Sequence, residues 1–149
     1  MTNENVSQAG GAGGKKSFGR YVTTIVRLLL GLMFLGLGVM GLLNYMTPPK
    51  NTPEYILTIL KALTDAGYLK VVAGTEVLAG ALLLLNLFVP LALALLAPIV
   101  VGILTYHVFV QPTTIVPGVV VAVMELYLAF AYRGAFKPML RPRVTPGAH

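Results

Sequence analysis

Long apolar stretches, separated by short polar breaks, fill most of the sequence. They cover residues of about 21–46, 68–88, 90–110 and 114–132. A helix needs about 20 apolar residues to cross the roughly 30 Å of hydrocarbon in a bilayer, and each stretch is about that long. The sequence therefore predicts an all-α fold, a membrane-embedded bundle of four helices.

The composition excludes an ordinary soluble domain. Hydrophobic residues make up 56% of the chain, charged residues only 11%, and the mean hydropathy is +0.81. Soluble domains carry about 25% charged residues. A chain of 149 residues is too short to bury that much apolar surface in one aqueous core. We expect lipid to be the solvent of one transmembrane domain over residues 20–137.

The connection between the first two spans predicts a short amphipathic helix over about residues 53–66. Pro53 suits the first position of a helix, and Glu54 suits the positive end of its dipole. Apolar residues then recur at helical spacing, opposite Lys61 and Asp65. We expect this helix to lie on the membrane surface or over the bundle.

Basic residues concentrate at the two ends of the chain. Residues 1–19 predict a disordered tail, and residues 138–149 form a basic C-terminal tail. Because membrane proteins keep basic flanks in the cytoplasm, we expect both termini to be cytoplasmic and the 47–67 connection to lie outside. The same distribution argues against a nucleic-acid partner. The basic residues at the two ends are Lys15, Lys16, Arg20, Arg27, Arg133, Lys137, Arg141 and Arg143.

The chain has no cysteine and only two histidines, His107 and His149. The absence of cysteine removes disulfides, thiolate nucleophiles, iron–sulfur ligation and Cys-based zinc sites. A bis-histidine haem within the bilayer would need two intramembrane histidines, and only His107 falls in a span. We therefore predict no metal site in this chain.

Four ionisable residues fall within the predicted spans: Arg27, Glu76, His107 and Glu125. A charge near the bilayer centre costs about 2.5–3.5 kcal/mol on insertion scales, so such residues are expected to face neighbouring helices. All but His107 share a helix face with small residues, which mark close contacts between membrane helices. The pattern predicts that these groups point away from lipid.

Helical rise predicts two groupings by depth. Glu76 and His107 form an outer pair, and Asn44 and Tyr45 could complete a polar pocket there. A carboxylate and an imidazole near a water-facing end are the groups needed for proton exchange or for hydrogen-bonding a quinone headgroup. A purely structural role for the pair is the alternative.

Arg27 and Glu125 form the second grouping, a predicted ion pair nearer the inner side. Interhelical polar contacts in membranes are often structural and contribute about 0.6 kcal/mol each. The sequence leaves a structural tie and a functional role both open.

Three segments resemble the DoxX family of small bacterial membrane proteins. They are Lys70–Gly80 with the Leu run after it, Phe88–Pro98 leading to His107-Val108-Phe109, and Glu125–Arg133 with Phe136-Lys137-Pro138. The resemblance covers about residues 20–141. It implies a four-helix protein of the bacterial cytoplasmic (inner) membrane. Some members are membrane subunits of quinone-linked oxidoreductases or of thiol and oxidative-stress complexes.

Two hypotheses of function follow. In the first, the chain is a membrane subunit or anchor of a quinone-linked redox complex, not catalytic alone, with electrons supplied by a soluble partner subunit or a bound small molecule. In the second, it is a non-enzymatic scaffold or a conduit for small solutes or protons. Assembly into a homo-oligomer is left open.

Overall fold

The computed structural model describes residues 12–140, with side chains described for residues 18–138. The predictions for residues 1–11 and for most of the C-terminal tail, including Arg141, Arg143 and His149, lie outside the described part.

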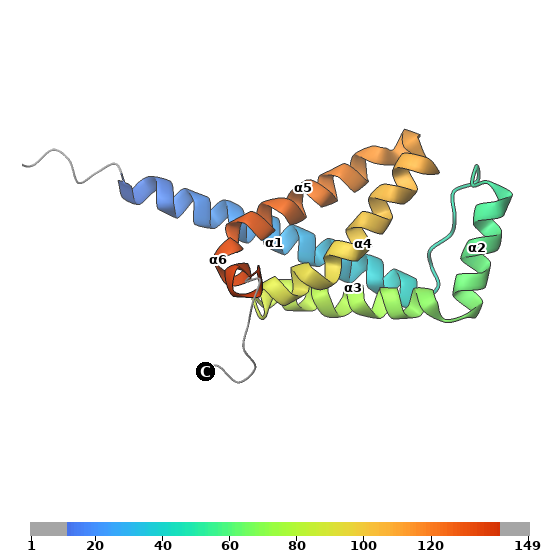
Figure 1. The fold of residues 1–149 in the computed structure, drawn as a ribbon, viewed down its shortest axis with the longest axis horizontal. Coiled ribbons are helices and arrows are strands. Elements are labelled where there is room, and N and C mark those ends of the chain that lie inside the picture. The colour runs from blue at the N-terminus through green and yellow to red at the C-terminus, as the bar shows by residue number, and fades with distance from the viewer. Residues whose placement is uncertain (1–11, 141–149) are drawn as a thin grey trace, which may run out of the picture.

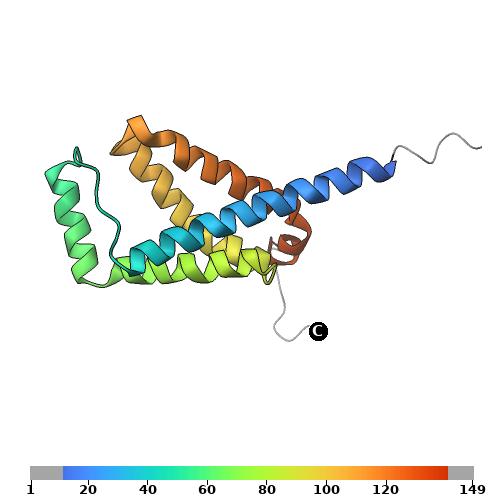
Figure 2. The ribbon, with the colours of Figure 1, turned by 180° about the vertical axis from the view of Figure 1, so that it is seen from behind.

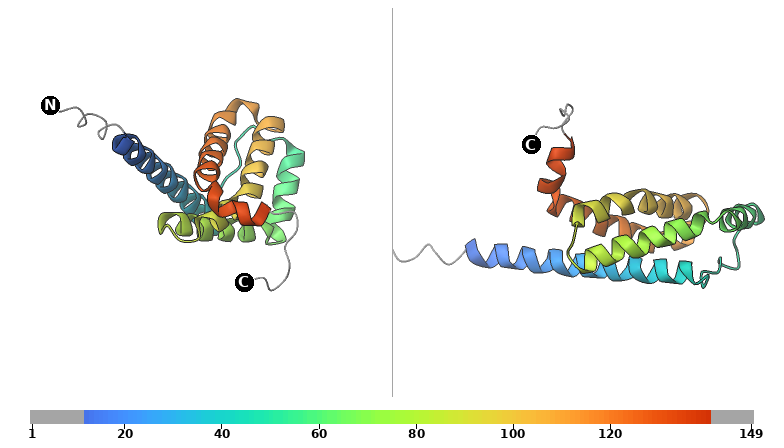
Figure 3. Two further views of the ribbon diagram at one scale, coloured as in Figure 1. Left: turned by 60° about the vertical axis from the view of Figure 1, so that its left-hand side comes forward. Right: turned by 90° about the horizontal axis from the view of Figure 1, so that it is seen from below.

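The longest helix is α1, Ala12–Leu42, which projects beyond the other helices on its N-terminal side (Figure 1, Figure 3). The prediction of a disordered tail over residues 1–19 differs from the structure for residues 12–19, which are helical. Extending an existing helix fixes one residue for each new hydrogen bond, whereas starting one is costly. The apolar span therefore carries the helix into the polar residues before it.

Four long helices form the bundle, and shorter elements connect or flank them (Figure 1). After α1 come α2 (Glu54–Asp65), α3 (Tyr68–Leu84), α4 (Val89–Phe109), the 3-10 turn η1 (Pro112–Thr114), α5 (Ile115–Ala131), α6 (Arg133–Phe136) and η2 (Lys137–Leu140). The described residues contain helices and connecting turns without strands, as predicted.

Three segments are long and apolar enough to cross a membrane: Phe18–Leu42, Val89–Phe109 and Pro112–Ala131. A fourth is added if α2 and α3, which meet at a 75° bend, count as one broken span. With 17 residues, α3 is at the lower limit for a spanning helix. The predicted all-α, membrane-embedded bundle is thus confirmed.

The predicted second span, residues 68–88, is longer than α3, which ends at Leu84. Asn86 has a left-handed backbone (φ 57°), and the Leu87 amide donates to the Leu82 carbonyl at 2.9 Å. These are the marks of a Schellman motif, which ends a helix by satisfying its last carbonyls.

Helices α1 and α3 lie side by side and are in backbone contact (Figure 1, Figure 2). A Cβ atom on Gly38 would lie 2.6 Å from the Ala73 carbonyl oxygen, and one on Gly80 would lie 2.6 Å from the Leu35 nitrogen. Only glycine fits at such distances. The predicted close-contact face on α1 is therefore present, and α3 occupies it.

The second half of the bundle diverges from the first. Helix α4 starts close to α1 and α3 and rises away from them to its turn with α5, and α5 returns from that turn toward α1 (Figure 1, Figure 2). Helix α2 stands beside the open side. The fully buried core lies where the four helices converge, and consists mainly of Leu30, Phe34, Leu83, Leu96 and Leu128.

Candidate functional site

A cavity of about 1040 Å³ lies where the helices diverge. Its walls come from α1, α2, α3, α4 and α5 and are almost entirely apolar. Five of the lining residues have polar side chains: Tyr68, Thr75, Glu76, Tyr106 and His107. The two ionisable residues predicted to form an outer pair therefore lie on one cavity.

Glu76 enters the wall from the middle of α3. Ala73, Glu76, Ala79, Gly80 and Leu83 form the buried face of this helix, and Glu76 itself is only 8% exposed. Its carboxyl group makes no hydrogen bond to another described residue. Glu76 thus presents an unpartnered polar group within an apolar wall.

His107 enters from the last turn of α4. Its Nδ1 lies 2.8 Å from the Ile103 carbonyl oxygen, and its ring meets the Tyr106 ring edge-on at 5.6 Å between centroids. The ring packs over Gly118 of α5, where a Cβ atom would lie 3.4 Å from Nδ1. Within the described residues Nε2 has no hydrogen-bond partner, and Glu76 does not bond the ring directly.

The structure does not bring Asn44 or Tyr45 into the cavity wall, where the sequence predicted them. Asn44 has φ 57°, and the Tyr45 amide donates to the Met40 carbonyl at 2.9 Å. Asn44 therefore ends α1 in a second Schellman motif. Tyr45 is 69% exposed, and the next residue in the sequence, Met46, lines the cavity in its place.

Arg27 does not form the predicted ion pair with Glu125. Its guanidinium donates to the Leu83 carbonyl, near the C-terminus of α3, and the residue is buried. Carbonyls in the last turn of a helix carry the negative end of its dipole and attract cations. Arg27 is thus a tie between α1 and α3.

Glu125 is 7% exposed, and its Oε1 atom is buried without a hydrogen-bond partner. It belongs to the buried face of α5, one turn beyond Val121, which lines the cavity. The Thr23 hydroxyl lies 3.1 Å from the Tyr127 hydroxyl and ties α1 to α5 near this level. Glu125 therefore lies in the bundle interior next to the cavity wall.

Gly102 and Tyr106 belong to the cavity wall but were not among the predicted site residues. With Pro98 they follow a step of four residues along α4, which is the spacing of one helix face. A Cβ atom on Gly102 would meet nothing within 4 Å. The four-residue spacing from Pro98 is the sequence signal by which Gly102 and Tyr106 could have been predicted.

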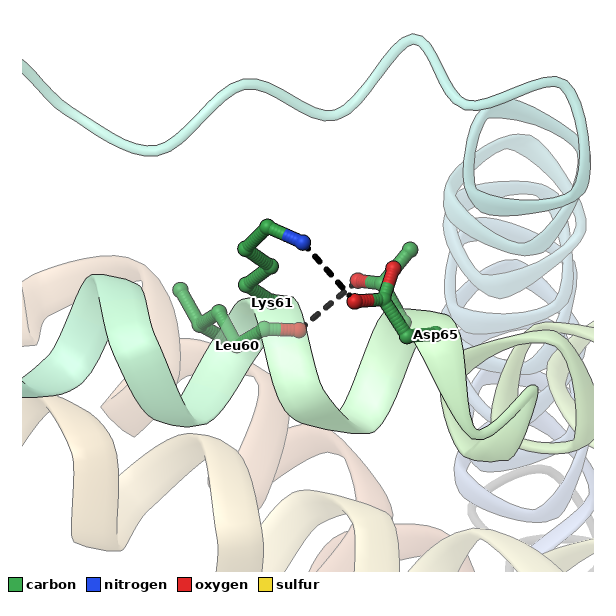
Figure 4. Close-up of polar contacts among 4 residues, drawn as sticks. Leu60, Lys61 and Asp65 are labelled. Carbon is green, nitrogen blue, oxygen red and sulfur yellow. Dashed lines mark hydrogen bonds and ion pairs between the residues drawn. The ribbon is translucent and has the colours of Figure 1, made fainter.

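The amphipathic character predicted for α2 is present. Leu60 and Leu63 line the cavity, whereas Lys61 and Asp65 are exposed and form an ion pair at 2.9 Å (Figure 4). An exposed pair of this kind adds at most about 1 kcal/mol to stability. α2 thus covers one side of the cavity with its apolar face.

The fold and the cavity together define the class of protein: a multi-pass membrane protein with an open, mostly apolar cavity between its helices. No family model, curated protein or solved structure matches the chain.

Proposed function

We propose that this chain is a DoxX-like membrane subunit of a quinone-linked redox complex, and that its cavity binds the quinone. The observation that carries the proposal is the placement of Glu76 and His107 on one apolar cavity of about 1040 Å³. Glu76 and His107 do not hydrogen-bond to each other, so the carboxyl group and the imidazole Nε2 are both available to a ligand.

The chemistry of the wall suits a ligand with a large apolar body and a small polar head. Binding cavities are mostly apolar, with a few polar groups that fix the orientation of the ligand. An isoprenoid quinone has such a ring and tail. Imidazole and carboxyl groups at membrane depth are typical of sites that hydrogen-bond a headgroup or exchange protons.

The cavity lies toward the end of the bundle that holds α2 and the turn between α4 and α5. Lys50, Lys61 and Lys70 lie around α2 at this end, whereas Arg20, Arg133 and Lys137 lie toward the opposite end. In the sequence, Lys15, Lys16, Arg141 and Arg143 add to the basic residues on the flanks of that opposite end. With basic flanks inside, the quinone site belongs to the outer half of a bacterial cytoplasmic membrane, and both termini are cytoplasmic. Because the chain has no cysteine, electrons come from a soluble partner subunit or a bound small molecule.

The test is whether the protein purified from its native membrane retains quinone. Gly102→Phe directs a ring into the cavity from a position where a Cβ atom meets nothing within 4 Å. The matched control is Gly36→Phe, because Gly36 is exposed on α1 and equally free of neighbours. We expect quinone with the wild type and with Gly36→Phe, and its loss with Gly102→Phe and with His107→Leu.

Quinone that persists in Gly102→Phe would contradict the proposal. A wild-type protein that carries no quinone and no partner, and whose cavity variants differ only in stability, would favour the scaffold or conduit instead.

A further inference from the structure

We propose that the cavity selects ligands whose polar head donates a hydrogen bond, so that a hydroquinone binds more tightly than the corresponding quinone. This inference rests on the proposed function and names the form of the ligand that the site prefers. A membrane alcohol offers the same hydroxyl donor, and the experiment below separates the two sources.

The first support is the orientation of the His107 ring. A carbonyl oxygen can only accept a hydrogen bond, so the 2.8 Å contact with Ile103 places the ring hydrogen on Nδ1. In a neutral imidazole the other nitrogen, Nε2, is then an acceptor. Gly118 of α5 lies beside the Nδ1 edge of the ring.

The second support is the carboxyl group of Glu76. An ionised carboxylate only accepts hydrogen bonds, whereas a protonated one offers an acceptor oxygen and an O–H donor. No described residue donates a hydrogen bond to it. The two ionisable groups of the wall therefore both offer acceptors.

The hydroxyl groups of the other lining residues do not offset this excess of hydrogen-bond acceptors. The Thr75 hydroxyl already donates to the Val71 carbonyl at 2.9 Å. The hydroxyls of Tyr68 and Tyr106 can accept as well as donate, so they can bond either form of a ligand. The Nε2 acceptor of His107, together with the carboxylate of Glu76 when it is ionised, therefore decides the preference.

The two forms of a quinone differ in the groups that they present to these acceptors. A quinone carbonyl facing Nε2, or an oxygen of Glu76 in its ionised form, places acceptor against acceptor and leaves both without a partner. A hydroquinone O–H completes the hydrogen bond, and unpaired polar groups in an apolar site are unfavourable. The preference is a difference in binding and requires no reaction within the chain.

The experiment measures dissociation constants in lipid nanodiscs for three decyl-chain ligands: a benzoquinone, its hydroquinone and the dimethyl ether of that hydroquinone. Subtracting the signal of Gly102→Phe removes partition into lipid. We expect the hydroquinone to bind at least about tenfold more tightly than either other ligand. For a two-electron couple, tenfold corresponds to a rise of about 30 mV in the midpoint potential of the bound quinone.

Farnesol and its methyl ether form the second arm. If the alcohol binds as tightly as the hydroquinone and its ether does not, the donor preference stands but a membrane alcohol is the ligand. Equal affinities for quinone and hydroquinone would overturn the inference while leaving the quinone site intact. No binding of any probe would overturn both.

The His107 ring nitrogens provide an independent measurement. The chain has only two histidines, so His149→Ala leaves one imidazole to observe by ¹⁵N NMR. We expect the hydrogen on Nδ1 without ligand, and a changed Nε2 signal with hydroquinone but not with its ether. A hydrogen on Nε2 in the free protein would overturn the inference even if His107→Leu failed to fold.

Discussion

Three charged residues are buried in the bundle interior, where each polar group needs a hydrogen-bond partner, and the three differ in whether they have one. Arg27, Glu76 and Glu125 are 7%, 8% and 7% exposed. Arg27 bonds a backbone carbonyl of α3, Glu76 faces the cavity, and Glu125 has an oxygen without a partner. Since a buried polar atom without a hydrogen bond costs about 1–3 kcal/mol, only the arginine is clearly stabilising.

Replacement of Glu125 by leucine tests that assignment. An apolar residue of similar volume removes the unpartnered oxygen, so we expect stability to be unchanged or to rise by about 1–3 kcal/mol. The measurement is the temperature at which the detergent-solubilised protein aggregates, with Val123→Leu on the exposed side of α5 as control. A large loss of stability would show that the carboxyl group has a partner.

Arg27 gives the opposite expectation. Arg27→Met removes the donor to the Leu83 carbonyl, and we expect a loss of about 1–3 kcal/mol, partly restored in Arg27→Lys. The same aggregation assay measures it. Arg20→Met is the control because Arg20 is exposed on the same helix. Equal stability of the Arg27 and Arg20 variants would contradict the tie between α1 and α3.

At the scale of elements, the contact between α1 and α3 is the most demanding feature of the bundle. A Cβ atom at position 38 would lie 2.6 Å from the Ala73 carbonyl oxygen and 2.7 Å from the Val77 nitrogen. We expect Gly38→Ala to destabilise the bundle by about 1–3 kcal/mol. Gly36→Ala should have little effect, because its Cβ meets nothing within 4 Å. Similar melting of the two variants would contradict the backbone contact.

The sequence predicted these elements better than their ends. The length of the apolar stretches predicted the long helices, and the placement of Lys61 and Asp65 opposite the apolar residues predicted α2. Asn44 and Asn86 were not recognised as helix-ending residues, because asparagine adopts the left-handed conformation less regularly than glycine. The ends of α1 and α3 were misplaced for that reason.

The candidate site could be predicted only in part. Glu76 and His107 stand out because ionisable residues are rare at membrane depth. Most of the cavity wall could not be found, because in a membrane protein an apolar side chain that lines a cavity resembles one that faces lipid. The exposed Val101 and the cavity-lining Ile103 differ in position rather than in chemistry.

For the whole molecule, the orientation in the membrane is the decisive test. The natural absence of cysteine allows single cysteines to be introduced without further changes. We expect Lys61→Cys in α2 to react with an impermeant maleimide in intact spheroplasts, and Arg133→Cys to react only after the membrane is opened. Both positions are exposed in the structure. The reverse pattern would place the quinone site in the cytoplasmic half.

The backbone contact between α1 and α3 makes this helix pair the rigid part of the molecule, in contrast to α2 and the α4–α5 hairpin. Glycines at positions 38 and 80 bring the backbones of these two helices into direct contact, so that they pack more closely than any other helix pair in the described residues. We therefore expect a rearrangement that admits a bulky molecule to come from the α4–α5 hairpin and from α2, which has no buried residue. We expect α1 and α3 to stay fixed relative to each other while the α4–α5 hairpin moves relative to them.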